Sequence, residues 1–271
     1  MSSFLEDVKT RRSVRTFDGN EVAPEILQDL KDFAANIKNP YNIPVRFKFL
    51  NAAEYGLSSP VLAGEKLYVS AMMKKGEHAE EAYGYSFEAL LVHAHKLGLG
   101  TVWIGGTMPR EKFEKASELK DGELMPCVSP LGKPASKMSV KETLMRKGVG
   151  ADKRLDFGEL FFKGDFNTPL TETEAKNIGI YEALEAVRCA PSAVNKQPWR
   201  VVICGDQAHV YEKHDRGYVN ENYDLQKIDV GIALYRLEQG LLSAGKNANF
   251  SCEAPEIAMP SNVDYIATIT Y

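Results

Sequence analysis

The segment Arg11-Arg12-Ser13-Val14-Arg15 gathers three guanidinium groups and a hydroxyl within five residues. Arginine forms bidentate, charge-assisted hydrogen bonds to phosphate oxygens, so this cluster favours binding of a phosphate. A solvated helix end is the alternative interpretation, because cations near a helix C-terminus also interact favourably with its dipole.

A second candidate segment reads Ala190-Pro191-Ser192-Ala193-Val194-Asn195-Lys196-Gln197-Pro198-Trp199. Its two prolines favour an irregular loop, and its Ser, Asn and Gln side chains offer both donors and acceptors. Such an array suits recognition of a planar heterocycle or of its sugar-like tail. An Asx-turn with Trp199 as a core residue is the structural alternative.

The third segment, Leu97-Gly98-Leu99-Gly100-Thr101-Val102-Trp103-Ile104-Gly105-Gly106, is not a dinucleotide fingerprint. Trp103 occupies the position of the third glycine, and the segment follows a predicted helix rather than a strand. The pair Gly105-Gly106 still allows a backbone N–H to approach a ligand closely.

We predict no metal site. His93 and His95 are two residues apart on a predicted helix and therefore point in different directions. The four cysteines form no C-x-x-C pair, which favours isolated reduced thiols.

The length of 271 residues fits one large domain or two small ones. A formal net charge of -4 argues against a general nucleic-acid or anionic-membrane binder. Neither a signal peptide nor a membrane-spanning apolar stretch is visible, so we expect a cytoplasmic protein with no membrane partner.

Hydrophobic periodicity predicts the elements that must position these segments. The predicted helices are a short one from Ser3 to about Arg11–Ser13, one beginning at Pro24, Ser86–Leu97, Tyr181–Arg188 and Asp229–Ala244. The predicted strands are Val45–Phe49, Leu67–Val69, Trp199–Ile203 and Val263–Ile269. The basic stretch Lys137–Arg154 is interpreted as a connecting segment, either a solvated linker or a carrier of cations that face a phosphate.

The order helix, strand, long helix and glycine stop occurs twice and indicates a degenerate duplication. Pro44-Val45-Arg46 matches Pro198-Trp199-Arg200. The residues Gly84, Leu90 and Gly98 match Gly231, Leu237 and Gly245, each 147 positions later.

Taken together, the motifs RRSVRTF, GLGTVWIGG, LGKP (131–134) and APSAVNKQPWR resemble the signature set of the FMN-dependent nitroreductase family. In ordinary members the A-P-S-x-x-N-x-Q-P-W loop precedes the G-L-G-T segment, whereas here it follows it. Those members are homodimers with FMN at the subunit interface, and this chain resembles such a dimer fused into one polypeptide, as in the single-chain subfamily. The resemblance implies an α+β layered fold of mainly antiparallel sheets and helices, duplicated as a pseudo-dimer. It also implies intertwined halves at residues 1–150 and 151–271.

Site roles follow from the same resemblance. The implied FMN-binding residues are Arg11, Arg12, Ser13, Arg15, Gly105, Gly106, Arg154, Pro191, Ser192, Ala193 and Asn195. Arg11 and Ser13 would hold the phosphate and ribityl end, Arg15 would lie near N1/O2, and Gly105-Gly106 would present an N–H to N5. Arg154 would be a further phosphate ligand, and residues 191–195 would line the opposite wall. The first half has Asn39–Pro44 where this loop belongs, so only one complete site is expected.

The implied activity is NAD(P)H-dependent reduction of a nitroaromatic, quinone or other electron-poor acceptor, with hydride passing through flavin N5 in ping-pong fashion. No acid–base catalytic residue is expected, because the flavin carries the chemistry. Two alternatives stay open: an FMN-binding protein without turnover, and a flavin dehydrogenase or dehalogenase with a specific metabolite. We expect a monomer with one FMN per chain.

Overall fold

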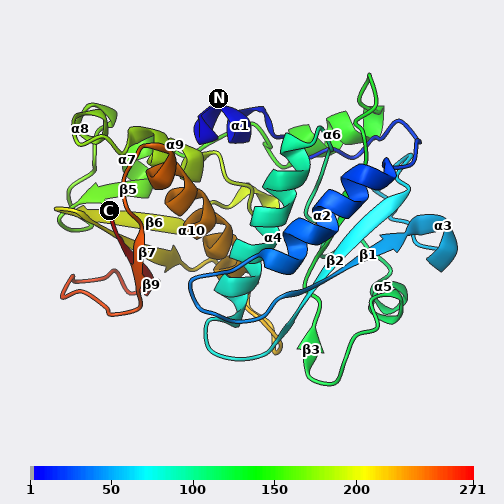
Figure 1. Cartoon of the computed structure of the whole chain (residues 1–271). Coiled ribbons are helices and arrows are strands. Elements are labelled where there is room, and N and C mark those ends of the chain that lie inside the picture. Colours follow the sequence, from blue (N-terminus) through cyan, green and yellow to red (C-terminus); the bar gives the residue numbers. More distant parts are fainter. Residues whose placement is uncertain (1–2) are drawn as a thin grey trace. The chain divides into compact units, whose positions relative to one another are not determined.

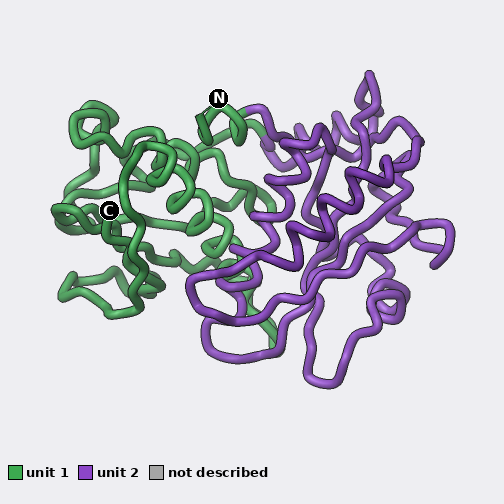
Figure 2. Tube along the Cα trace, viewed as in Figure 1, with its two compact units in different colours: residues 1–9, 152–271 green, residues 10–151 purple. Residues whose placement is uncertain are grey.

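The computed structural model describes residues 3–271 and divides the chain into two compact units (Figures 1 and 2). Unit 1 comprises Met1–Lys9 and Asp152–Tyr271, and unit 2 comprises Thr10–Ala151. The chain therefore begins in one unit, passes through the whole of the other, and returns. Among the described residues no helix has the length and apolar character needed to cross a membrane.

Unit 2 is built on a four-stranded antiparallel sheet in which β2 is the central strand. Its strands are β1 (Arg46–Asn51), β2 (Leu67–Lys74), β3 (Glu123–Leu124) and β4 (Val128–Leu131). Its helices are α2 (Pro24–Asn36), α3 (Ala52–Tyr55), α4 (Ala79–Lys96), α5 (Arg110–Ala116) and α6 (Val140–Gly148). Helix α4 packs on β2, and α2 packs on α4 (Figure 1). The first seven residues of β2 are all buried, as expected for a strand covered on both faces.

Unit 1 contains a five-stranded sheet in the order β5-β6-β7-β9-β8, parallel only between β5 and β6. Its strands are β5 (Phe161–Lys163), β6 (Trp199–Cys204), β7 (Gln207–Lys213), β8 (Asn249–Ser251) and β9 (Val263–Thr270). Its helices are α1 (Phe4–Thr10, whose last residue belongs to unit 2), α7 (Phe157–Leu160), α8 (Glu172–Asn177), α9 (Tyr181–Arg188), the 3₁₀ turn η1 (Ala193–Asn195) and α10 (Leu225–Ser243). Helix α10 packs on α9 and on β6 and β7 (Figure 1).

The predicted duplication is visible as a shared order of elements. In unit 2 a helix, α2, precedes the antiparallel pair β1-β2, then comes the long helix α4, and β4 returns to pair with β2. In unit 1 the same order runs α9, β6-β7, α10 and β9, which pairs with β7. Each long helix is followed by a left-handed glycine, Gly98 (φ 83°) and Gly245 (φ 73°), which ends it. The α+β layered prediction is confirmed.

The structure differs from the sequence prediction at several elements. Helix α4 begins at Ala79 rather than Ser86, and α10 begins at Leu225 rather than Asp229, because Asp224 caps it by accepting from two backbone N–H groups. The stretch 137–154 is not only a linker, since it contains α6. Strand β7 was not predicted at all.

Gly240 allows α9 and α10 to approach closely. A Cβ atom on Gly240 would lie 2.5 Å from the Cα of Ala183, a contact that backbone atoms must move to relieve. We expect Gly240→Ala to lower the free energy of unfolding by about 1–3 kcal/mol, although alanine is the better helix former. Urea denaturation measures the change. The control is Gly148→Ala in α6, where the added Cβ meets no atom within 4 Å and stability is expected to stay level or rise. An equal change in the free energy of unfolding in the two variants would contradict the close packing of α9 on α10.

Candidate functional site

The arginine-rich segment of unit 2 lies in extended form against the glycine-rich segment that follows α4. Ser13 forms a parallel bridge with Thr101, and the Val14 N–H donates to the Thr101 carbonyl at 2.9 Å. A Cβ on Gly100 would come within 2.8 Å of the Val14 side chain, so glycine is required for this approach. The structure thus brings two of the three sequence motifs together within one unit.

A single buried carboxylate anchors this segment. Glu142, on α6, has a side chain with 0% exposure and lies 2.5 Å from Nη1 of Arg12. Its second oxygen accepts from the Arg15 N–H at 3.2 Å and from the Thr16 hydroxyl at 2.7 Å. The sequence analysis missed Glu142, although Ser139 and Glu142 have capping-box spacing and Ser139 Oγ does accept from the Glu142 N–H. Within the basic stretch 137–154, it is therefore this acid, rather than one of the cations, that makes the buried contact with the arginine-rich segment.

Arg15 differs from Arg12 in its surroundings. Its Nη1 atom is buried and has no hydrogen-bond partner. Burial lowers the pKa of the Arg15 guanidinium, an effect that Glu142 opposes and Arg146 reinforces. Because an arginine stays charged in proteins, unit 2 holds a buried cationic donor that an anionic or acceptor-rich ligand would satisfy. The Thr101 hydroxyl is likewise buried without a partner.

The Gly105-Gly106 pair is held at the end of this glycine-rich segment. Ile104 and Val128 exchange both backbone hydrogen bonds at 2.9 Å, and Arg110 Nη2 donates to the Gly105 carbonyl at 3.1 Å. A Cβ on Gly106 would meet nothing within 4 Å. The structure therefore leaves open space beside the Gly106 backbone.

In unit 1 the proline-bounded loop 191–198 has an unusual backbone. Val194, Asn195 and Gln197 have φ values of 49°, 58° and 53°, in a region that non-glycine residues rarely adopt. The Ser192 Oγ accepts from the Gln197 N–H at 2.9 Å and holds the turn closed. Strain of this kind persists only where neighbouring contacts impose it, and it is typical of ligand-binding loops.

Arg154 lies beside this loop. The Asn195 side chain donates to the Lys153 carbonyl at 2.9 Å, and the Gln197 side chain accepts from the Leu155 N–H at 3.0 Å. Burial lowers the pKa of Arg154, as expected for a guanidinium moved away from water. The structure thus ties the backbone on both sides of Arg154 to the loop through Asn195 and Gln197, while Pro191, Ser192 and Ala193 belong to the same loop.

Asp229, on α10, supports the same loop and was not predicted. Both of its carboxylate oxygens accept from the Ala193 N–H, at 3.2 and 3.0 Å, and the residue is buried. Burial raises the pKa of Asp229 well above its ordinary value, and the nearby Asp224 and Glu212 raise it further. The sequence signal that could have pointed to Asp229 is an acidic residue within an otherwise apolar helical stretch.

We expect Asp229 to make stability depend on pH. Because its folded-state pKa is raised, its contribution is fully present below the ordinary value of 3.8 and is lost as pH rises through the folded-state pKa. Wild-type chain should therefore lose stability relative to Asp229→Asn as pH rises, by at most about 1.4 kcal/mol per pH unit. Urea denaturation of both proteins across the pH range checks this. A difference that is independent of pH would show that Asp229 stays ionised when folded.

The two histidines of α4 have separate partners. His93 Nε2 lies 2.5 Å from Asp29 Oδ1, and His95 Nε2 lies 2.9 Å from Thr10 Oγ1. The two rings therefore point in different directions and contact different residues of unit 2, as the helical spacing predicted.

A groove of about 830 Å³ in unit 2 follows the loop Asn39–Pro44, the segment that stands where a second flavin loop would be expected. Its lining includes none of the predicted FMN-binding residues. Two of its cations are already paired, Arg46 with Glu123 and Lys48 with Glu118. Lys31 and Lys38 also line the groove, so it keeps some positive charge. Because it contains none of the predicted FMN-binding residues, we do not assign it as the candidate cofactor site.

Comparisons with known proteins identify the family and the fold. A family model described as "Putative TM nitroreductase" matches residues 3–241. The structure of a "putative nitroreductase" from Thermotoga maritima is similar over 99% of this chain and 94% of that chain, with 16% identity and a TM-score of 0.63. An "FMN-dependent Nitroreductase" from Clostridium difficile R20291 covers 52% of this chain and 94% of its own, with 18% identity and a TM-score of 0.42. A "Putative NADH Oxidase" from Clostridium acetobutylicum covers 49% and 89%, with 24% identity and a TM-score of 0.41.

No curated protein matches the chain. The Thermotoga maritima structure shows the fold, and the family model spans most of the 271 residues. The resemblance drawn from the four sequence motifs is thereby confirmed, and the chain belongs to the nitroreductase family that this model describes.

Proposed function

We propose that the chain binds one FMN and is an NAD(P)H-dependent oxidoreductase that reduces a nitroaromatic, quinone or other electron-poor acceptor. Besides family membership, the observation that carries the proposal is Arg15, whose buried Nη1 has no hydrogen-bond partner. Burying a charged donor without a partner is costly, and a flavin offers both phosphate oxygens and ring carbonyl acceptors.

The unit 2 residues fit such a cofactor. In the proposal Arg11 and Ser13 bind the phosphate and ribityl end, and Arg15 places its charge near N1/O2 of the ring. The guanidinium of Arg12 is already paired with Glu142, so we assign it the task of holding the segment in place. The extended backbone beside Gly106 is the proposed donor toward N5.

The unit 1 residues are assigned to the same FMN. Pro191, Ser192, Ala193 and Asn195 form the strained loop, and Arg154 is tied to it through its chain neighbours. Support for this assignment comes from the loop's polar groups and from the absence of an R-R-S segment in the second half of the sequence. Only one complete set of FMN-binding residues exists per chain, and we therefore propose a monomer with one FMN.

When bound, FMN supplies hydride transfer between NAD(P)H and the acceptor. The chain's own residues then have electrostatic and positioning roles. Arg15 would hold the flavin ring through its positive charge, and electrostatic stabilisation of this kind is usually the largest single contribution to catalysis. Asp229 holds the Ala193 N–H and so fixes the loop in its strained conformation.

Anaerobic reduction of the FMN-loaded chain tests the function. We expect the yellow colour to bleach on addition of NADH or NADPH and to return on addition of a nitroaromatic or a quinone. Bleaching without return by either acceptor would exclude the proposed acceptor class. Failure of both nucleotides to bleach a chain that retains FMN would favour an FMN-binding protein without turnover.

A further inference from the structure

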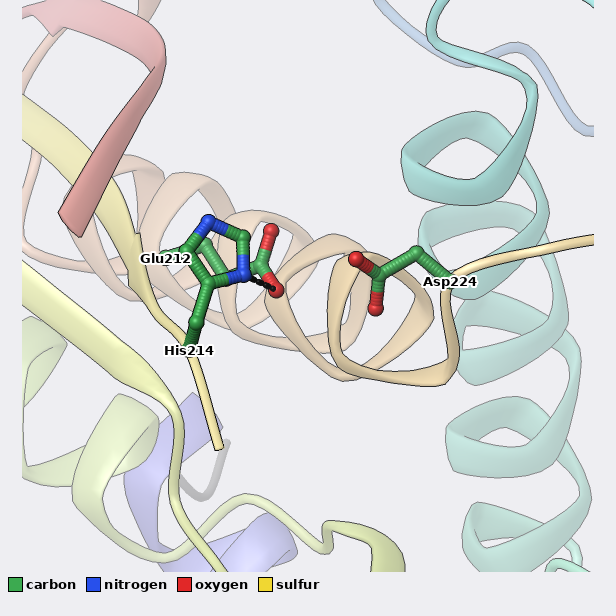
Figure 3. A group of neighbouring side chains, drawn as sticks. All are labelled: Glu212, His214 and Asp224. Atoms are coloured by element: carbon green, nitrogen blue, oxygen red, sulfur yellow. Dashed lines mark ion pairs between the residues drawn. The ribbon is translucent and has the colours of Figure 1, made fainter. Parts of the chain in front are cut away.

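Three side chains that the FMN proposal does not use form a cluster in unit 1 (Figure 3). Glu212, His214 and Asp224 each offer one ligand atom, and these atoms all lie within 4.8 Å of one another. Figure 3 shows the Glu212 carboxylate between the His214 ring and the Asp224 carboxylate.

Local structure explains why the three side chains meet. Glu212 lies near the end of β7, and His214 follows the last residue of this strand, so the two side chains are two positions apart along extended chain and face the same side. Asp224 caps α10 by accepting from the Gln226 N–H at 2.8 Å. The Gln226 side chain also accepts from the Asp215 N–H at 2.7 Å, which ties the end of β7 to the start of α10.

Glu212 lacks the partners that a buried carboxylate requires. Its side chain has 0% exposure, and neither of its oxygens takes part in a hydrogen bond. The basic group beside it is His214, whose Nδ1 lies 2.9 Å from Oε1 but not in hydrogen-bond geometry. A buried carboxylate in this condition needs either a positive charge beside it or a proton.

His214 is oriented as a metal ligand is. Its Nε2 lies 2.8 Å from Asp264 Oδ2, on the strand that neighbours β7. That hydrogen bond favours the proton on Nε2 and leaves the Nδ1 lone pair facing the Glu212 carboxylate. A carboxylate behind the distal nitrogen is the usual outer partner of a metal-bound histidine.

We propose that Glu212, His214 and Asp224 bind a divalent metal ion of the Zn²⁺ class. Zn²⁺ accepts both imidazole nitrogen and carboxylate oxygen as ligands, and three protein ligands leave a fourth position for water. Two carboxylates and a neutral imidazole balance the charge of the ion. Asp264 adds further negative charge at the cluster, and Lys227 is the cation whose charge acts on Glu212.

The proposal replaces the sequence-based expectation of no metal, which rested on the helical pair His93 and His95. Binding requires only a small closure of the cluster, since ligand atoms at typical zinc distances of about 2.0–2.2 Å from the ion stand closer together than 4.8 Å. The competing explanation is a proton shared between Glu212 and His214, which would neutralise the pair without an ion.

Calorimetric titration of the EDTA-treated full-length chain with ZnCl₂ decides between them. We expect one Zn²⁺ per chain, with the affinity lowered at least about 100-fold in Glu212→Gln and His214→Gln. Asp264→Asn should lower it by about 10- to 100-fold, because it removes only the outer partner. Asp264 is 65% exposed, so this variant tests the site without disturbing the core.

The matched control is His78→Gln. His78 also lies near two glutamates, with Nε2 3.8 Å from Glu77 and Nδ1 3.7 Å from Glu81, and its loss should leave Zn²⁺ affinity unchanged. Co²⁺ in place of Zn²⁺ gives a second readout, since a bound ion absorbs visible light in wild-type chain and not in His214→Gln. The proposal is overturned if wild-type chain shows no saturable Zn²⁺ binding, or if Glu212→Gln binds Zn²⁺ as well as wild type does. Neither readout involves FMN, so the result is independent of the proposed function.

Discussion

Arg15→Ala is expected to raise the dissociation constant for FMN by about 10- to 150-fold, the effect of losing one charge-assisted interaction of about 1.5–3 kcal/mol. The buried Nη1 of Arg15 has no partner within the chain, so its removal breaks no internal hydrogen bond at that atom. The loss should therefore appear in cofactor binding rather than in folding. Titration of the apo-protein with FMN, followed by quenching of flavin fluorescence, measures it.

Lys147→Ala is the control, because it removes one positive charge from the exposed surface of α6 in the same unit. It should leave the FMN affinity close to that of wild type, since exposed charges are screened. Arg15→Lys should fall between the two, because a lysine keeps the charge and loses the planar fork. Equal FMN affinity in Arg15→Ala and wild type would remove Arg15 from the site.

Glu142→Ala is expected to lower the free energy of unfolding by about 3 kcal/mol, the lower part of the range for breaking a buried ion pair. The carboxylate is fully buried while Arg12 is 33% exposed, so the arginine left behind regains part of its hydration. The substitution also leaves the Arg15 N–H and the Thr16 hydroxyl without their acceptor. Guanidinium chloride denaturation measures the change.

Glu142→Gln should lower the free energy of unfolding by less, because an amide oxygen still accepts from Thr16 and from the Arg15 backbone. The surface control is Glu111→Ala in the exposed first turn of α5, expected to cost at most about 1 kcal/mol. A loss at Glu142→Ala no larger than that at Glu111→Ala would show that the arginine-rich segment is not anchored through α6.

Much of the fold could be predicted because its signals are local. Alternating side chains marked β1 and β9, and the glycines after α4 and α10 marked the ends of both long helices. The starts of those helices were placed too late. The first turn of α10 depends on the Asp224 cap rather than on apolar periodicity, and α4 begins after His78, whose backbone is left-handed and whose side chain makes no cap. The strand β7 was missed because it is stabilised by pairing with β6 and β9, and its own sequence carries no clear strand pattern.

The sequence indicated which residues belong to the candidate site, but not which of them pair with one another. The motifs pointed to Arg11–Arg15 and Pro191–Asn195, but nothing in one sequence separates Arg12, paired with Glu142, from Arg15, whose Nη1 has no partner. Burial decides that difference, and burial is a tertiary property. The same holds for Glu212, an acid whose complete burial is not indicated by its neighbours in the sequence.

The central claim is that residues of both halves serve one FMN. Ser192→Leu tests the unit 1 half, because it adds bulk at an extended position of the loop (φ -145°). Its control is Ser192→Ala, which removes the same hydrogen bond to the Gln197 N–H without adding bulk. If the claim holds, Ser192→Leu lowers FMN retention as much as Arg11→Ala does, although the two residues belong to different units.

The most direct measurement is the molar ratio of FMN to protein in purified chain soaked with excess FMN and then freed of unbound flavin. The ratio comes from flavin absorbance and amino-acid analysis, with the mass in solution determined by light scattering. We predict one FMN per monomer. Two FMN per chain, or none after soaking, would contradict the account of a fused pair of halves with a single complete site.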